Sequence, residues 1–177
     1  MSATKVLGIV GWSGSGKTTL ITRLIPLLVS RGLRIATLTH ANHAFDVDQP
    51  GKDSYEHRKA GASEVIVSSA RRWVLMHEIG DGAEATLAEH LRRLSPCDLV
   101  LVEGYKTERH PKLEVFRQSV GKTPLHPTDS RIVAVASDQP LPHYLAIPHV
   151  DLNDIGVVAD VVWARAEPLE QVIQSLG

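Results

Sequence analysis

A glycine-rich motif near the start of the chain leaves few folds open to it. The eight residues Gly11–Thr18, GWSGSGKT, match the phosphate-loop pattern G-x-x-x-x-G-K-[ST] at every position. The apolar, β-branched run Val6–Val10 precedes the motif, and Lys17–Arg31 follows it with leucines at helical spacing. A chance glycine- and serine-rich turn is the alternative. The complete motif between a strand and a helix instead favours a loop that binds phosphate.

The residue types of this loop suit a triphosphate. Glycines let successive backbone amides point inward at phosphate oxygens, and the next helix presents its positive dipole end to the same anion. Lys17 supplies a mobile charge for the β- and γ-phosphates, the Thr18 hydroxyl is placed to ligate Mg²⁺, and Thr19 is expected to reach the α-phosphate. The predicted nucleotide-binding residues are Gly11, Ser13, Gly14, Ser15, Gly16, Lys17, Thr18 and Thr19.

A phosphate loop also needs an acidic residue at the end of a neighbouring strand. Glu103 follows the apolar run Leu99–Val102 and is predicted to lie at the carboxyl edge of the sheet, beside the phosphates. Glu103 would hold Mg²⁺ there or polarise a water molecule. Lys17 and Asp53 are the other predicted catalytic residues. A strand-end acid that only faces solvent is the alternative for Glu103.

Strand and helix patterns alternate along the chain. Further strands are expected at Ile35–Thr39, Glu64–Ser68, Trp73–His77, Leu99–Val102, Leu113–Phe116 and Ile132–Ala136, and further helices at Ser54–Ala60, Ala83–Leu94 and Leu169–Leu176. This order predicts an α/β, three-layer P-loop fold with a mainly parallel, doubly wound sheet. Residues 1–177 are expected to form a single nucleotide-binding domain, and Pro26 is expected to kink or divide the first helix.

Two polar segments carry further candidates. His40 and His43 have the H-x-x-H spacing of a transition-metal site, but a polar loop that faces nucleotide or solvent is the favoured interpretation. Asp53 is a candidate N-cap of the next helix, and would act near Mg²⁺ or on the attacking water if that cap faces the γ-phosphate.

Base recognition is only partly marked in the sequence. Small GTPases read guanine with an N/T-K-x-D segment at a strand end, where the acid pairs with the ring nitrogens. No complete copy is present, but Asp138 follows the strand Ile132–Ala136 at about the right place. A turn-forming Asp before Gln139-Pro140 is the alternative.

Composition excludes several classes of protein. Lys plus Arg number 19 and Asp plus Glu 20, so no net charge attracts nucleic acid or anionic lipid. The longest apolar runs, such as Leu24–Val29, fall far below the ~18 residues that span a bilayer. Cys97 is the only cysteine, so a reducing cytoplasm is the expected location.

Several motifs in a fixed order resemble one known family. They are the phosphate loop, the His40-x-x-His43 loop, Pro50–Ser54 with His57–Ala62, Val102–Lys106, and Pro111–Val115. Together they are similar to the molybdopterin-guanine dinucleotide biosynthesis adapter proteins, the MobB family, over about residues 5–137. The resemblance implies a homodimer that binds GTP with Mg²⁺ and hydrolyses it weakly. It also implies molybdopterin or its guanine dinucleotide as a further ligand, and the cofactor guanylyltransferase and molybdoenzymes as partners.

Two other functions stay open at this point. One is a P-loop small-molecule kinase, whose arginine-bearing lid would be sought at Glu108–Pro111. The other is a metallochaperone GTPase that holds a metal at His40 and His43. Slow hydrolysis is expected, because none of Arg71, Arg72 or Arg109 is marked as a built-in arginine finger.

Overall fold

The structure is a computed structural model of the 177-residue chain, and it describes residues 3–41, 46–141 and 146–177. Contacts divide the chain into two compact units. The first comprises residues 1–40 and 86–177, and the second, residues 41–85, is inserted between these two parts.

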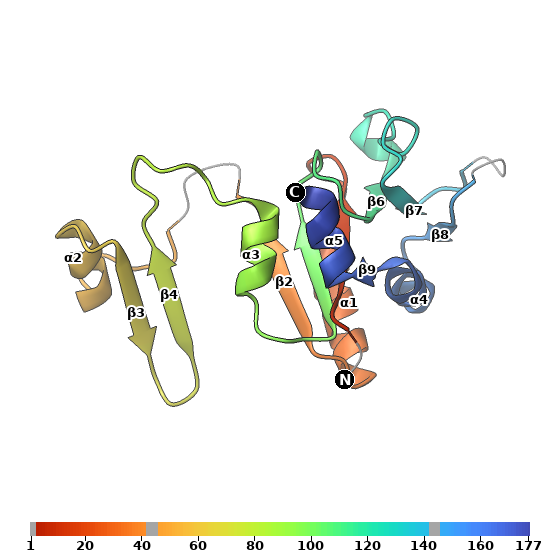
Figure 1. Ribbon diagram of the computed structural model, residues 1–177. Helices are drawn as coiled ribbons and strands as arrows, with labels where there is room; N and C mark the ends of the chain where they lie inside the picture. Colours follow the sequence, from red (N-terminus) through yellow and green to blue (C-terminus); the bar gives the residue numbers. More distant parts are fainter. Residues whose placement is uncertain (1–2, 42–45, 142–145) are drawn as a thin grey trace. The chain divides into compact units, whose positions relative to one another are not determined.

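The first unit is built on a mainly parallel sheet (Figure 1). Its strand order is β2-β5-β1-β6-β7-β8, with a short β9 antiparallel to β1. The strands are β1 (Lys5–Val10), β2 (Ile35–Thr39), β5 (Leu99–Glu103), β6 (Lys112–Phe116), β7 (Ile132–Ser137), β8 (His149–Asp151) and β9 (Glu167–Pro168). The central strand β1 is apolar and almost wholly buried, as a strand covered on both faces must be. The predicted α/β fold with a mainly parallel sheet is confirmed.

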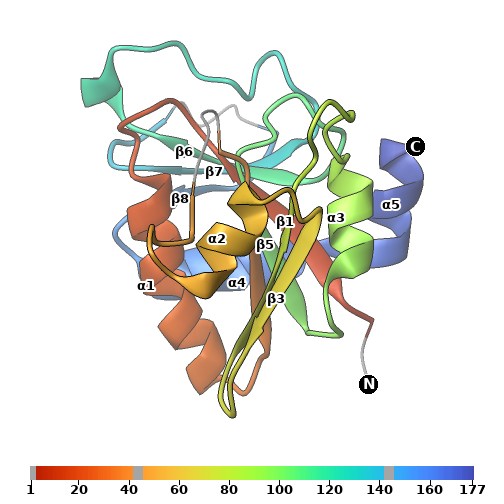
Figure 2. The same cartoon turned by 90° about the vertical axis from the view of Figure 1, so that its left-hand side faces the viewer.

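Helices cover both faces of this sheet, as Figure 2 shows. On one face α1 (Lys17–Ser30) and α4 (Ile155–Arg165) pack against each other and share a core with side chains such as Leu7 and Leu101. On the other face α3 (Leu87–Arg93) and α5 (Leu169–Leu176) bury Leu91 and Val172 against Val6 and its neighbours. Both faces are therefore closed by apolar packing, and the carboxyl edge of the sheet stays available for a site.

The second unit has its own small sheet. Strands β3 (Glu64–Ser68) and β4 (Trp73–His77) pair antiparallel, so these two predicted strands lie outside the parallel sheet. Helix α2 (Asp53–Lys59) packs on β3. Arg58 on α2 forms ion pairs with three carboxylates, those of Asp46, Asp48 and Glu78. The Arg58 guanidinium thus ties the entry and exit segments of the unit together.

Helix α1 continues through Pro26, so the expected division of this helix is wrong. Pro26 lies on the exposed face, where water can satisfy the carbonyl that its missing amide leaves unpaired.

Two predicted helix starts are also wrong. Helix α3 begins at Leu87 rather than Ala83, because Thr86 and Glu89 form a capping box. Asp53 is the first helical residue of α2, and the N-cap is Lys52, whose side chain makes no capping hydrogen bond.

The C-terminal region adds elements that the sequence patterns leave unassigned. Asp154 caps α4 by accepting a hydrogen bond from the Val157 amide at 3.1 Å. The strand β8 before it joins the edge of the sheet beside β7. Within the residues that the structure describes, no helix has the length and apolarity needed to cross a membrane.

Candidate nucleotide site

The glycine-rich segment forms a tight loop between β1 and α1. Gly11, Gly14 and Gly16 have φ angles of 152°, 81° and 93°, a region that favours glycine. At Gly11 a Cβ atom would lie 2.5 Å from the Val115 carbonyl oxygen and 2.6 Å from Ser15 Oγ. The backbone therefore follows the course that a phosphate loop requires, and glycine is obligatory at its first position.

Lys17 lies at the mouth of this loop, in the first turn of α1. Its Nζ donates a hydrogen bond to the Trp12 carbonyl at 3.2 Å. Partial burial lowers the pKa of Lys17, an effect that the nearby Lys106 reinforces and Glu103 opposes. An ammonium group that is partly dehydrated and repelled by a second cation gains from the arrival of a polyanion.

Thr18 and Glu103 meet beside the loop. The Thr18 hydroxyl donates to Glu103 Oε1 at 2.7 Å, which joins the first turn of α1 to the end of β5. A hydroxyl and a carboxylate at this distance form a hard oxygen pair of the kind that suits Mg²⁺. The residues present thus fit the metal that the sequence motif implies, and Glu103 faces the loop rather than solvent alone.

Other predicted loop residues fall into two groups. Ser13, Gly14, Thr18 and Thr19 are exposed at the surface. Ser15 is buried, and its Oγ has no hydrogen-bonding partner in the described part of the chain.

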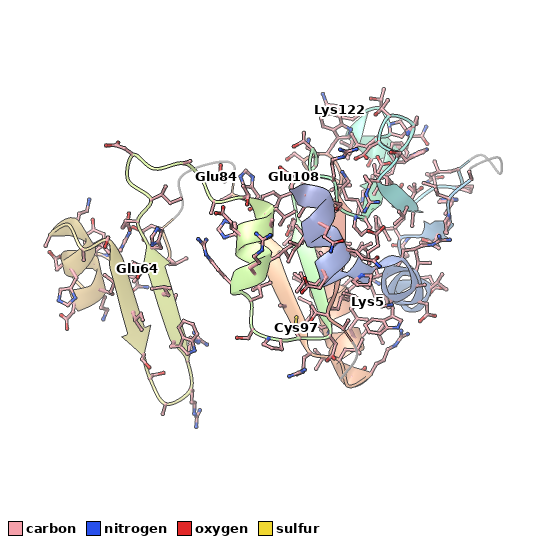
Figure 3. The ribbon with its side chains drawn as sticks, viewed as in Figure 1. Lys5, Glu64, Glu84, Cys97, Glu108 and Lys122 are labelled. Carbon is pink, nitrogen blue, oxygen red and sulfur yellow. The ribbon has the colours of Figure 1, made fainter. Side chains whose placement is uncertain are left out.

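Two lysines that sequence reasoning missed lie beside Trp12 of the loop. Trp12 donates its indole N–H to the Thr123 carbonyl at 2.8 Å. Lys106 and Lys122 place their ammonium groups 4.5 Å and 5.9 Å from the centre of the Trp12 ring. Lys122 and the segment around Glu108 lie toward the same end of the sheet, and Cys97 lies toward the other (Figure 3). Two cations therefore lie beside Trp12 at this end of the sheet, in addition to Lys17.

His40 directly follows β2 and lies at the same edge, beside the end of β5. The His40 amide donates to the Glu103 carbonyl at 3.1 Å, and the His40 ring lies 4.9 Å from the Tyr105 ring. Tyr105 has a φ of 50°, a strained value for a bulky residue. His43 lies outside the described residues, and among those described no group of three His, Cys, Asp or Glu side chains could hold a metal.

Two buried charges on β6 organise the surrounding loops. Lys112 Nζ donates to the carbonyls of Lys106 and Glu108 and pairs with Asp129 at 2.6 Å. Glu114 accepts hydrogen bonds from the amides of Leu125 and His126 at 2.7 and 2.9 Å. The Glu108–Pro111 segment, where the kinase alternative would have its lid, is anchored to β6 through Lys112, and this favours a fixed wall over a lid.

Arg117 and Asp138 form the remaining contact with the loop. The Arg117 Nε donates to the Ser15 carbonyl at 3.0 Å, and Nη1 pairs with Asp138 Oδ2 at 3.1 Å. Asp138 directly follows β7 and is joined to the loop through Arg117; its role in base recognition stays a prediction. Arg117 was not among the predicted site residues.

The remaining candidates make none of the contacts described above. Asp53, Arg71 and Arg72 belong to the second compact unit, and a role for Asp53 at the γ-phosphate stays a prediction. Arg109 is exposed, and its carbonyl accepts a hydrogen bond from Ser175 on α5.

A parallel sheet with a glycine-rich phosphate loop between β1 and α1 defines a protein of the P-loop NTPase fold. The family model described as MobB, molybdopterin guanine dinucleotide synthesis protein B, matches residues 6–138. The chain belongs to this family.

Individual relatives agree with the family match. The molybdopterin-guanine dinucleotide biosynthesis adapter protein of Escherichia coli (strain K12) is 46% identical over 160 residues, covering 89% of this chain and 90% of that protein. The protein of the same name from Haemophilus influenzae (strain ATCC 51907 / DSM 11121 / KW20 / Rd) is 41% identical over 158 residues, 89% of this chain and 86% of its own length. A crystal structure of molybdopterin-guanine biosynthesis protein B superposes with a TM-score of 0.68 at 27% identity, covering 90% of this chain and 98% of the other.

Proposed function

We propose that this protein is a GTP-binding adapter with weak intrinsic GTPase activity that assists the biosynthesis and delivery of molybdopterin guanine dinucleotide. The observation that carries the proposal is the phosphate loop with its Lys17 ammonium and its Thr18–Glu103 pair, in a chain of the MobB family. Two relatives with adapter names, matched over 89% of this chain, support the adapter role.

The site residues divide the work of holding the nucleotide. The loop amides and Lys17 bind the phosphate oxygens, and Thr18 and Glu103 hold Mg²⁺. When bound, the metal neutralises phosphate charge. Exchange of the Lys17–Trp12 hydrogen bond for phosphate contacts replaces a weak partner by a strongly charged one, which favours binding.

The position of Arg117 supports weak hydrolysis. The Arg117 guanidinium donates to the Ser15 carbonyl oxygen of the loop. It is therefore not placed to neutralise charge that develops on the γ-phosphate. An arginine finger is worth about 10³–10⁵ in rate, and Arg117 does not supply that gain. Such a site suits a protein whose nucleotide state governs a partner.

Two parts of the proposal concern partners. Homodimer formation is supported by β3 and β4, on which Ile66, Trp73 and Leu75 share one exposed face; Trp73 is 66% exposed. From the family and from the names of the relatives, we propose two kinds of protein partner, the cofactor guanylyltransferase and the molybdoenzymes. The proposed ligand is molybdopterin or its guanine dinucleotide.

The proposed location is the cytoplasm. Cys97 is a free, buried thiol, which fits a reducing cytoplasm.

Competition binding tests the proposal. GTP and ATP would each compete with a fluorescent guanine nucleotide in Mg²⁺, with and without the molybdopterin-containing cofactor. We expect selective binding of GTP that the cofactor strengthens. Equal binding of GTP and ATP, or phosphoryl transfer to a pterin or nucleoside instead of release of phosphate, would favour a kinase and contradict the adapter role.

A further inference from the structure

One guanidinium joins the phosphate loop to the strand end that carries the base-recognition candidate. Arg117 directly follows β6, Asp138 directly follows β7, and the two are 21 residues apart in sequence. The Arg117 Nε is 3.0 Å from the Ser15 carbonyl oxygen, and Nη1 is 3.1 Å from Asp138 Oδ2. Both side chains are mostly shielded, with 33% and 21% of their surfaces exposed. The bridge is therefore a built feature of the site edge.

The bond to Ser15 ties Arg117 to the backbone of the loop. In a loop that cradles an anion the amides face the anion. Arg117 donates instead to the Ser15 carbonyl, and its Nη1 is engaged by Asp138. A Cβ atom at Gly16 would lie 3.4 Å from the Arg117 Nε, so the contact continues along the loop. Arg117 is thus a positioning residue and not a group that touches the transferred phosphate.

Asp138 has one oxygen left for a ligand. Its Oδ2 is held by Arg117, while Oδ1 is buried and has no hydrogen-bonding partner among the described residues. A buried carboxylate oxygen without a donor is costly, and a donor from a ligand relieves that cost. Guanine presents N–H donors at N1 and at its exocyclic 2-amino group, whereas adenine presents an acceptor at N1.

We propose that Arg117 orients Asp138 toward guanine and couples base recognition to the phosphate loop. The inference rests on the proposed binding of GTP. In small GTPases, the base-reading acid and the other residues of the N/T-K-x-D segment follow the same strand. Here the acid comes from the end of β7 and its support from the end of β6, which accounts for the incomplete motif after β7.

Nucleotide selectivity tests this coupling, because a merely structural residue would not change it. Affinities for GTP, ITP and ATP would be measured for the parent protein, Arg117→Ala, Arg117→Lys and Lys17→Ala. ITP lacks the 2-amino group. We expect Arg117→Ala to reduce the GTP-to-ITP preference about tenfold and Arg117→Lys to reduce it less, since lysine keeps the charge but not both hydrogen bonds. Lys17→Ala should weaken all three nucleotides and leave their ratios unchanged.

Two outcomes separate the inference from the proposed function. A parent protein that binds no guanine nucleotide overturns both. A parent protein that prefers GTP, together with Arg117 variants that keep the same GTP-to-ITP ratio, overturns the coupling alone. As a second measurement, Asp138→Asn should gain affinity for XTP about tenfold, because xanthine presents a 2-oxo acceptor to the new amide. In the Arg117→Ala background we expect this gain to disappear, and a gain of equal size would contradict the coupling.

Discussion

The Thr18 hydroxyl donates a hydrogen bond of 2.7 Å to Glu103 Oε1. These two residues are 85 positions apart in the sequence, and they meet because β5 lies beside β1 in the parallel sheet. The same register places the end of β5 next to the start of α1. The two side chains that we propose as metal ligands are therefore brought together by the sheet itself.

Replacement of Glu103 tests the metal role. Glu103→Gln keeps the size of the side chain but removes the charge, so we expect Mg²⁺-dependent affinity for GTP to fall about tenfold, or roughly 1.4 kcal/mol. Affinity in EDTA should change little, because the loop amides and Lys17 remain. Titrations with and without Mg²⁺ measure both values. Glu170→Gln, on the exposed first turn of α5, is the matched control. An equal loss in both buffers would contradict a metal role.

His110 gives the protein a pH-dependent stability. Burial, together with the charges of Lys112 and Arg131, lowers its pKa from 6.5 to about 4. The unfolded chain gains this proton near pH 6.5 and the folded chain only near pH 4. The free energy of unfolding is therefore fully retained above pH 6.5 and falls as the pH drops toward 4, by about 3 kcal/mol at most.

Urea unfolding at pH 7.5 and pH 5.0 measures this effect. His110→Gln removes the titrating group, so we expect the variant to lose about 2 kcal/mol less than the parent between the two pH values. The two proteins are compared by the change in their free energy of unfolding between these pH values, because the substitution itself alters stability at both. Identical pH dependence in the two proteins would show that His110 is not the group responsible.

Glu114 is expected to stabilise the segment after β6. Its carboxylate is fully buried and accepts hydrogen bonds from the amides of Leu125 and His126. Glu114→Gln places an amide donor against an N–H group, which should cost about 2–3 kcal/mol in the free energy of unfolding. Chemical denaturation measures the loss. The exposed Glu170→Gln should stay within about 0.5 kcal/mol of the parent, and a loss that small for Glu114→Gln would refute the anchoring role.

The exposed face of β3 and β4 should control oligomeric state. Trp73→Glu places a charge on the face shared with Ile66 and Leu75, so we expect sedimentation to shift from dimer to monomer. Val157→Glu alters a half-exposed apolar residue on α4 and serves as the control. The dimer surface would be misassigned if Trp73→Glu sediments as the parent does.

Local patterns in the sequence were enough for much of the fold. Strands β2, β3 and β4 and helix α5 have the predicted bounds, because alternation, leucine spacing and flanking turn residues are short-range signals. Helix α4 went unassigned. It is rich in valine, which has low helix propensity, and it is held instead by its Asp154 cap and by burial against α1.

The parts of the site that depend on strand order could not be predicted from the sequence. The loop residues and Glu103 carry a motif, so sequence reasoning finds them. Lys112 and Glu114 alternate with apolar residues on β6, a pattern that normally marks a solvent-facing side, yet both are buried under loops. Arg117 becomes a site residue only because β6 lies between β1 and β7, an arrangement with no local signature.

Calorimetric titration with GTP in Mg²⁺ tests most directly whether the loop between β1 and α1 binds a triphosphate. We expect the parent protein to bind with measurable heat. Lys17→Ala should lose at least tenfold in affinity while its thermal unfolding stays close to that of the parent, because the Lys17 charge contacts phosphate and not the core. Absence of heat with the folded parent protein, or unchanged affinity in Lys17→Ala, would contradict the assignment of the site.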